Sequence, residues 1–532
     1  MRLGKLIAVA ALLWACALVW VWRTPGLPAA SPVMYAAGDD GHLDRDLAAV
    51  LSHAGFTGTL ESTLFDSDHL RRPLNRPLAD LGNLLFFDNV LGLHEDNSCA
   101  GCHSPAFGFG DSQSIAIGTQ NNGIVGADRA GPRNMRKAPM AANAAFIPKL
   151  MLNGRFVALS GNPFDNSAGF GFPPPEGTPE GEAILFGPGD VHFPTLLSAQ
   201  GHIPETELVE MAGFTGAKTN PIFDHALFDQ FDDGKGTVLP HDTENIYGSA
   251  TPDGFLNEEI RSVVLGKIRN TTRYFKLFKQ VFGISNKNDI TFAMVGQALS
   301  EFQISLTFAN APIDQFARGD YDAMTDRQKR GALLFFGKAR CTKCHLASNE
   351  IFSDFENHRL GVPQLAPVFG AGCVDHRFRG CGNVFFDGLA ANEDFGREQI
   401  SHNPDDRYKF RTSPLRNVAM QPAFFHDGAF TRLEDAIRHH LNVRQSALSY
   451  DPVGAGVDAD LRHVGPIQNI LELPLDPLLK KVDLNPMEFR DLVTFVRGGL
   501  LDLRARPENL CRKVPKSVPS GLRVADFQGC PR

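Results

Sequence analysis

Two short motifs in this chain have the residue types and spacing of covalent cofactor attachment. Residues 99–103 read CAGCH and residues 341–345 read CTKCH, so each motif holds two thiols followed directly by a histidine. The thiols can form thioether bonds with the vinyl groups of a haem, and the histidine can bind the iron axially. A Cys-x-x-Cys pair alone would also suit a redox pair or half a zinc site, but the histidine in both copies favours haem. The predicted thioether residues are Cys99, Cys102, Cys341 and Cys344, and the predicted axial ligands are His103 and His345.

The group in the second axial position of each haem iron decides between electron transfer and catalysis, and a second histidine in that position favours electron transfer. Leu433, Ala436, Ile437, His440 and Leu441 recur at helical spacing and form one apolar stripe. We predict that His440, on this stripe, is the second ligand of the haem at His345, called haem 2 below. Its neighbour His439 follows Asp435 by four residues, and we expect these two side chains to form an exposed pair.

The N-terminus reads as an export segment. Basic residues in MRLGK precede an unbroken apolar run over residues 6–22, which Arg23 closes. The run is intermediate in length between a signal-peptide core and a spanning helix, and Trp20 and Trp22 are typical of an interfacial anchor. A removed signal peptide and an uncleaved inner-membrane anchor both fit, and the lack of a clear cleavage site favours the anchor. We expect a periplasmic protein.

Composition and charge narrow the class of protein. The chain has 532 residues, 43% of them hydrophobic and 21% charged, which predicts two or more globular domains. Its formal net charge of −8 comes without long runs of one sign, so no nucleic-acid partner is expected. Besides Cys16 in the export segment, four cysteines lie outside the haem motifs and suit local disulfides in an oxidising compartment, Cys373 with Cys381 and Cys511 with Cys530, although four cysteines allow three connectivities.

The elements that must position these residues are predicted to be mostly α-helical, because strand signals are sparse. Thr325 to Gln328 and Thr431 to Glu434 fit helix-capping boxes, and Asn485-Pro486 can open a helix that runs to about Val496. Helical patterns also cover residues 258–282 and 289–308. Residues 161–190 are too rich in Gly and Pro to continue any element, and we interpret them as a long ordered loop that could act as a lid.

The motifs and their surroundings resemble the bacterial di-haem cytochrome c peroxidases, a group that includes the methylamine dehydrogenase maturation enzyme. The resemblance extends from Leu78 to about Gly499, apart from insertions, of which residues 160–199 are the clearest. Besides the two haem motifs, the matching segments are LGNLLFFD at 81–88, GPRN at 131–134, NGR at 153–155, VEM at 209–211, ALSEF at 298–302, FARGD at 316–320, SPLRNVA at 413–419 and FFHDG at 424–428.

The resemblance implies two cytochrome c-like haem domains, and the composition predicts that they contain long Gly/Pro-rich loops. The expected organisation is an export signal or anchor over 1–30, a linker over 31–45, an N-terminal peroxidatic haem domain over 46–320 with an inserted loop at 160–199, a C-terminal electron-transfer haem domain over 321–500, and a tail over 501–532 that could carry a disulfide.

The resemblance also implies residue roles. Glu210, in the VEM segment, matches the family's distal glutamate, which takes a proton from hydrogen peroxide and returns it to the departing oxygen. A positioned carboxyl suits this role, because splitting the O–O bond requires a proton on the leaving hydroxide. Asn134 matches the side-chain ligand of a calcium ion, with carbonyl ligands near Gln421 and Ala423, and oxygen ligands suit calcium. A homodimer is also expected from the family.

Three positions depart from the family pattern. No histidine lies between His103 and His192, so the haem at His103, called haem 1 below, is predicted to be open without a gating histidine. We do not expect His192 or His202 to reach it, because histidines of inserted loops are mostly solvated. The family's methionine ligand aligns with His440, which predicts two histidine ligands and a lower potential for haem 2. The tryptophan between the haems aligns with Leu152, and all three tryptophans of the chain lie in the export segment.

The leading functional prediction is a peroxidase that reduces hydrogen peroxide to water with electrons from a small cytochrome c or copper protein. One alternative is a di-haem oxidase or oxygenase that modifies an organic or protein substrate. The other alternative is a di-haem electron carrier without catalytic activity, which requires both irons to be six-coordinate.

Overall fold

The computed structural model describes residues 40–531, apart from residue 67 and three segments, 173–185, 214–256 and 367–392. The predicted export segment and the Cys373 and Cys381 pair lie outside the described residues. Among the described helices, none combines the length and apolar character needed to cross a bilayer.

The described chain is mostly helical, as predicted, and its strands are two or three residues long. The longer helices are α1 (Asp40–His53), α3 (Arg76–Phe86), α7 (Asn257–Asn270), α8 (Thr272–Phe282), α9 (Phe292–Ile304), α11 (Asp326–Phe336), α14 (Leu433–Leu441) and α17 (Pro486–Thr494). The shorter helices are α2 (Leu60–Thr63), α4 (Cys99–Cys102), α5 (Leu196–Gln200), α10 (Pro312–Ala317), α13 (Glu398–Ser401), α15 (Val443–Leu448), α16 (Ile467–Glu472) and α18 (Pro507–Leu510). The strands are β1 (Ile124–Val125), β2 (Lys149–Leu150), β3 (Phe156–Ala158), β4 (Phe170–Gly171), β5 (Asn357–His358), β6 (Leu365–Ala366), β7 (Phe410–Arg411), β8 (His463–Val464) and β9 (Asp526–Phe527).

The strands pair in small sheets that tie distant loops together. Strands β2, β3 and β4 form an antiparallel sheet in that order, with Leu150 opposite Phe156 and Ala158 opposite Phe170. Two antiparallel pairs, β5 with β7 and β6 with β8, lie in the C-terminal half, and β1 pairs in parallel with β9. Because β4 belongs to the predicted insertion at 160–199, the start of that insertion is part of a sheet and not a free loop.

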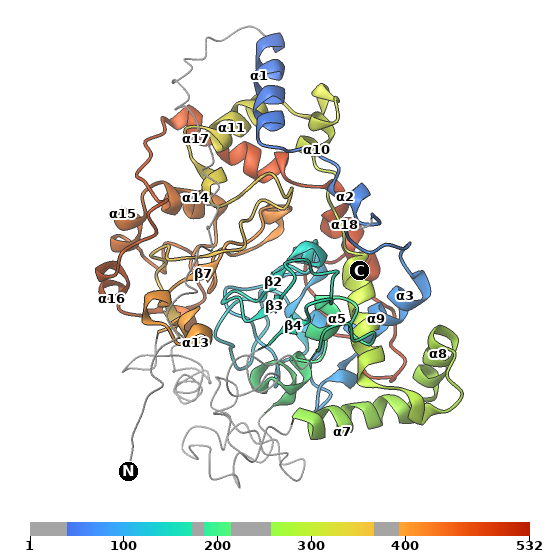
Figure 1. The fold of residues 1–532 in the computed structure, drawn as a ribbon. Helices are drawn as coiled ribbons and strands as arrows, with labels where there is room; N and C mark the ends of the chain where they lie inside the picture. Colours follow the sequence, from blue (N-terminus) through green and yellow to red (C-terminus); the bar gives the residue numbers. More distant parts are fainter. Residues whose placement is uncertain (1–39, 67, 173–185, 214–256, 367–392, 532) are drawn as a thin grey trace, which may run out of the picture. The chain divides into compact units, whose positions relative to one another are not determined.

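The same pair of packed helices occurs beside each haem motif (Figure 1). Helix α3 precedes the first motif and packs on α9, while α11 precedes the second motif and packs on α17. Gly82 of α3 allows this approach, because a Cβ there would overlap the carbonyl oxygen of Ala298 in α9. Gly331 of α11 has the same role against Asp491 of α17. The two haem motifs therefore lie in structurally repeated halves.

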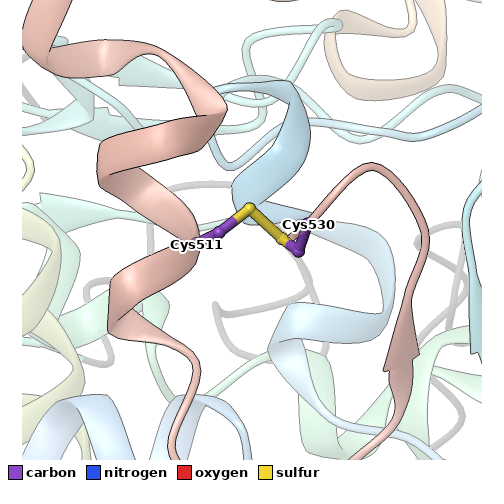
Figure 2. The surroundings of a disulfide bond; sticks show 2 residues. All are labelled: Cys511 and Cys530. Carbon is purple, nitrogen blue, oxygen red and sulfur yellow. A yellow bond between two sulfur atoms is a disulfide. The ribbon is translucent and has the colours of Figure 1, made fainter. Parts of the chain in front are cut away.

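Each terminal segment packs on the half of the chain that is distant from it in sequence. Leu47 and Leu51 of α1 belong to the hydrophobic core of the second half, together with Phe335 of α11. The C-terminal tail instead packs on the first half, where the ring of Phe527 lies 5.4 Å from that of Phe87. A disulfide between Cys511 and Cys530 closes this tail (Figure 2), which confirms the predicted pair.

Several local predictions can be compared directly with the helices. Helix α1 begins at Asp40, inside the predicted linker. Thr325 and Asn485 cap α11 and α17 as predicted, because the side chain of each accepts backbone N–H groups of the first turn. The helical pattern at 258–282 is interrupted, since α7 ends at Asn270 and Thr271 precedes α8.

The predicted capping box at Thr431 is wrong. Helix α14 begins two residues later, with Arg432 as its N-cap and no side-chain hydrogen bond to the first turn. The Thr431 hydroxyl donates to the carbonyl of Ala455 and is therefore engaged outside the helix.

Candidate functional site

The second haem motif faces His440 across one cavity. The cavity is bordered by Cys341, Cys344, His345 and His440, and the two imidazole rings have centroids 6.2 Å apart. Two imidazoles bound to opposite sides of one metal, each with a nitrogen about 2 Å from it, have ring centroids about 6 Å apart. The spacing therefore fits one iron between His345 and His440.

Backbone carbonyls orient both rings toward that position. His345 Nδ1 lies 2.9 Å from the carbonyl oxygen of Phe352, and His440 Nδ1 lies 2.8 Å from that of Ala436, one turn earlier in α14. A carbonyl only accepts, so each Nδ1 carries the proton and each Nε2 keeps its lone pair for a metal.

The prediction that His439 forms an exposed pair with Asp435 is wrong. The side chain is fully buried, because α15 and the segment around Leu360 cover this face of α14. Its Nδ1 lies 3.1 Å from the hydroxyl of Ser446 and its Nε2 lies 2.9 Å from the carbonyl of Leu360. Both nitrogens are engaged, so the geometry favours His440 over His439 as a ligand.

The first haem motif borders a larger cavity, of about 490 Å³. Its thiols are on α4, and His103 follows directly, with Nδ1 3.1 Å from the carbonyl oxygen of Phe109. This arrangement repeats that of His345 and Phe352, so His103 also keeps Nε2 free for a metal. We call this space the haem 1 cavity and the one at His345 the haem 2 cavity.

Glu210 lies in a π-helical turn, Leu208–Ala212, and borders the haem 1 cavity together with His103. The side-chain amide of Asn97 donates to the backbone carbonyl of Glu210 over 2.8 Å, which fixes this turn beside the motif. Burial and, to a smaller extent, the neighbouring carboxylate of Glu207 raise the pKa of the Glu210 carboxyl to about 7, although Arg155 and Asn134 act to lower it. A carboxyl with a pKa near neutrality can both accept and return a proton.

An ion pair between Arg155 and Glu207 lies beside Glu210, and the sequence alone did not predict it. Arg155 Nη2 lies 2.5 Å from Glu207 Oε1, and both side chains border the haem 1 cavity. NGR at 153–155 was a matching segment, but only the tertiary contact reveals that its arginine balances two carboxylates.

The histidines near the insertion do not border the haem 1 cavity. His192 is exposed and its Nδ1 lies 2.8 Å from Asp190, as expected of a solvated residue. His202 is buried among the rings of Phe186, Phe193 and Phe292, so the expectation that it is solvated is wrong, because the insertion packs into the core. Among the described residues, the histidines that border this cavity are His103 and His402, and His402 is exposed.

Three cations favour the presence of anionic groups in the two cavities. Buried Lys137 and half-buried Arg397 border the haem 1 cavity, buried Arg411 borders both cavities, and no ion pair joins any of them to a carboxylate among the described residues. Burial lowers the pKa of Lys137 to about 8 and that of Arg411 to about 10. Each haem carries two propionate carboxylates, which would compensate such charges. Thiols, histidines and cations thus fit two haems.

Asn134 contacts Glu210 and not a set of oxygen ligands. Its Nδ2 lies 3.5 Å from Glu210 Oε1, and its Oδ1 accepts the N–H of Met135. The side chain of Gln421, near the predicted carbonyl ligands, accepts from Lys137 at 2.6 Å. Among the described residues, the one group with metal-ligand spacing is Cys344, Asp354 and His358, and Cys344 is already a predicted thioether residue.

Comparison with known proteins gives the family. Residues 76–322 match the model of the di-haem cytochrome c peroxidases. This part of the chain belongs to the di-haem cytochrome c peroxidase family. The predicted family, one of oxidoreductases that carry haem, is therefore confirmed.

Relatives of this peroxidase family extend the match beyond residue 322. Cytochrome-c peroxidase IdrP1 of Pseudomonas sp. strain SCT is 32% identical over 33% of this chain and 47% of its own length, so the chain spans about half of that relative. Methylamine utilization protein MauG of Methylophilus methylotrophus is 22% identical over 82% of this chain and 89% of its own length. The solved structure of the dihaem peroxidase BthA from Burkholderia thailandensis E264 covers 86% of this chain and 92% of its own, with a TM-score of 0.50 and 19% identity, and supports the fold alone.

Proposed function

We propose that this chain is a periplasmic di-haem peroxidase that reduces hydrogen peroxide to water with electrons from a small redox protein. The observation that carries the proposal is the contrast between its cavities. The haem 1 cavity is bordered by Glu210 and His103, and no second buried histidine borders it among the described residues. The haem 2 cavity, by contrast, has a histidine on each side, His345 and His440. One cavity thus suits chemistry and the other suits electron entry.

In this proposal, one set of residues binds the haems and another transfers the proton. Cys99, Cys102 and His103 hold haem 1, and the corresponding residues of the second motif, with His440, hold haem 2. When bound, the haems supply the iron that binds peroxide and the electrons that reduce it. Reduction consumes two electrons and two protons and forms two waters. The Glu210 carboxylate accepts a proton from peroxide and returns it to the departing hydroxide, and burial, with the opposed effects of Glu207 and Arg155, places its pKa near neutrality.

Leu152 and Arg411 occupy the boundary between the cavities in place of the family's tryptophan. Leu152 is buried and borders the haem 2 cavity, and its carbonyl accepts the N–H of Arg411 at 2.8 Å. Arg411 borders both cavities. We propose that electrons cross here without a tryptophan radical, because the described residues contain no tryptophan.

Peroxide turnover by the haem-loaded chain with a reduced donor tests the proposal. We expect Glu210→Gln to lower kcat/KM for peroxide by about 10²–10³-fold. Glu472→Gln, an exposed site on α16, is the matched control and should behave as wild type. Wild-type turnover in Glu210→Gln would contradict the mechanism.

Spectroscopy distinguishes the alternatives. A fully low-spin spectrum with no cyanide binding would indicate an electron carrier, and oxidised organic or protein products would indicate an oxygenase. The domain boundaries, the export segment, the calcium ion at Asn134 and a homodimer stay predictions.

A further inference from the structure

The rim of the haem 2 cavity combines exposed leucines with cations. Arg340 and Lys343 of the second motif and Lys480 of a separate segment border this cavity. Leu346, directly after His345, is 39% exposed, and Leu478 is 37% exposed. We call these five residues the haem 2 rim. Exposed apolar side chains among charges are typical of a surface that meets another protein.

The cations of the haem 2 rim are not neutralised within the described chain. No described carboxylate pairs with them, and no Asp or Glu borders the haem 2 cavity. Nearby carboxylates are engaged elsewhere. The pairs are Glu488 with Lys338 at 2.7 Å, Asp483 with Lys481 at 3.2 Å, and Asp354 and Asp476 with His358 at 2.9 and 2.6 Å.

The haem propionates do not explain these cations at the motif. A haem carries its vinyl groups and its propionates on opposite edges, and the vinyl edge is the one joined to Cys341 and Cys344. Arg340 and Lys343 adjoin these cysteines in sequence, whereas the buried Arg411 reaches the boundary with the haem 1 cavity. Lys343 and Lys480 are exposed and therefore open to a partner, whereas Arg340 is half-buried.

We propose that the haem 2 rim is the docking surface for a small electron-carrier protein with an acidic face. The proposal rests on the proposed function and adds the charge of the partner. The whole chain has a formal charge of −8, so a local cationic rim selects both the place and the orientation of an acidic partner. The two leucines supply the apolar contact at the centre of such an interface.

Binding of two probe proteins to the haem-loaded chain tests this surface. The probes are an acidic small blue copper protein and a basic mitochondrial-type cytochrome c, each measured by calorimetry at low and high ionic strength. We expect tighter binding of the acidic probe, weakened by salt. The double variant Lys343→Glu and Lys480→Glu should weaken it at least about tenfold.

The matched control carries the same charge change on α8, which packs in the first half. Lys276 and Lys279 are both exposed and form no ion pair among the described residues, so the double variant Lys276→Glu with Lys279→Glu should bind the acidic probe within about twofold of wild type. Equal weakening by both double variants, or tighter binding of the basic probe, would overturn the docking surface.

Turnover with a small uncharged reductant separates this proposal from the proposed function. If the rim variant keeps peroxide turnover with that reductant but loses it with the acidic probe, both proposals stand. If the wild type turns over peroxide and the rim variant binds the acidic probe normally, only the docking surface fails. If the wild type reduces no peroxide with any donor, the proposed function fails.

Discussion

Glu210 is the residue on which the chemistry depends, and its surroundings set the pH at which it works. Its carboxyl must be ionised to accept a proton from peroxide. Because burial and Glu207 raise its pKa to about 7, a large fraction is protonated at neutral pH. We therefore expect kcat/KM for peroxide to rise with pH through about 7. A flat profile between pH 5 and pH 8, measured with saturating donor, would contradict this assignment.

Replacing the neighbour of Glu210 should move that profile. Glu207→Gln removes a like charge and frees Arg155 to act on Glu210, and both changes lower the pKa of Glu210. The rise in kcat/KM should shift to lower pH, with kcat on the alkaline plateau within about threefold of wild type. An unchanged midpoint would mean that Glu207 does not act on Glu210.

His440 can be tested separately from its buried neighbour. His440→Ala removes one of two ligands, so haem 2 should gain a high-spin spectrum, and His440→Met should raise its reduction potential. His439→Asn is the control. It should keep the low-spin spectrum while lowering the free energy of unfolding by about 1–3 kcal/mol, because the partners of a buried imidazole lose their hydrogen bonds. Loss of the low-spin signal in His439→Asn alone would reverse the two assignments.

At the scale of elements, the repeated helix pairs account for the two halves. The segments GNLLFF at 82–87 and GALLFF at 331–336 are alike in sequence, and each precedes one of the haem motifs. In each half the Phe four residues after the Gly meets a Phe on the partner helix. Phe86 and Phe302 have ring centroids 5.1 Å apart, and Phe335 and Phe495 have centroids 5.4 Å apart. The shared Gly and Phe of the repeat therefore specify how each helix packs on its partner, beyond the formation of the helix itself.

Gly82 gives a direct test of this contact. Gly82→Ala places a methyl group against the backbone of α9, so we expect a loss of about 1–3 kcal/mol in the free energy of unfolding. Gly266→Ala in α7 is the control, because a Cβ there meets no atom within 4 Å. It should be neutral or stabilise by up to about 1 kcal/mol through helix propensity. Denaturant titration compares the two variants, and equal stabilities would contradict the close packing of α3 on α9.

At the scale of the whole molecule, the first described helix and the C-terminal tail each pack on the half that is distant from them in sequence. Helix α1 completes the core beside the second motif, and the tail completes the core beside the first. The Cys511–Cys530 disulfide closes a sequence separation of 19 residues within that tail. Replacing both cysteines by serine should lower the free energy of unfolding by about 3 kcal/mol. Reducing conditions should have the same effect on wild type and none on the variant, as thermal unfolding would reveal.

The sequence by itself determined the features that are local. Two CxxCH motifs predict two haems, the apolar stripe predicts His440, and Thr325 and Asn485 predict helix starts, because each depends on residues a few positions apart. The same reasoning failed for Thr431 and His439, where contacts with Ala455 and Leu360 outweigh the local pattern. A pattern within one helix does not specify what covers its far side.

Only the tertiary structure decided how these features combine. It brings Glu210 to the cavity of His103, sets Glu207 and Arg155 beside it, and brings Arg340, Lys343 and Lys480 from separate segments to the border of the other cavity. Charge interactions and desolvation depend on distance and burial in space and not on separation along the chain. For this reason the sequence predicted which groups could react, and the fold determined the pKa of the acid and the side from which a partner can approach.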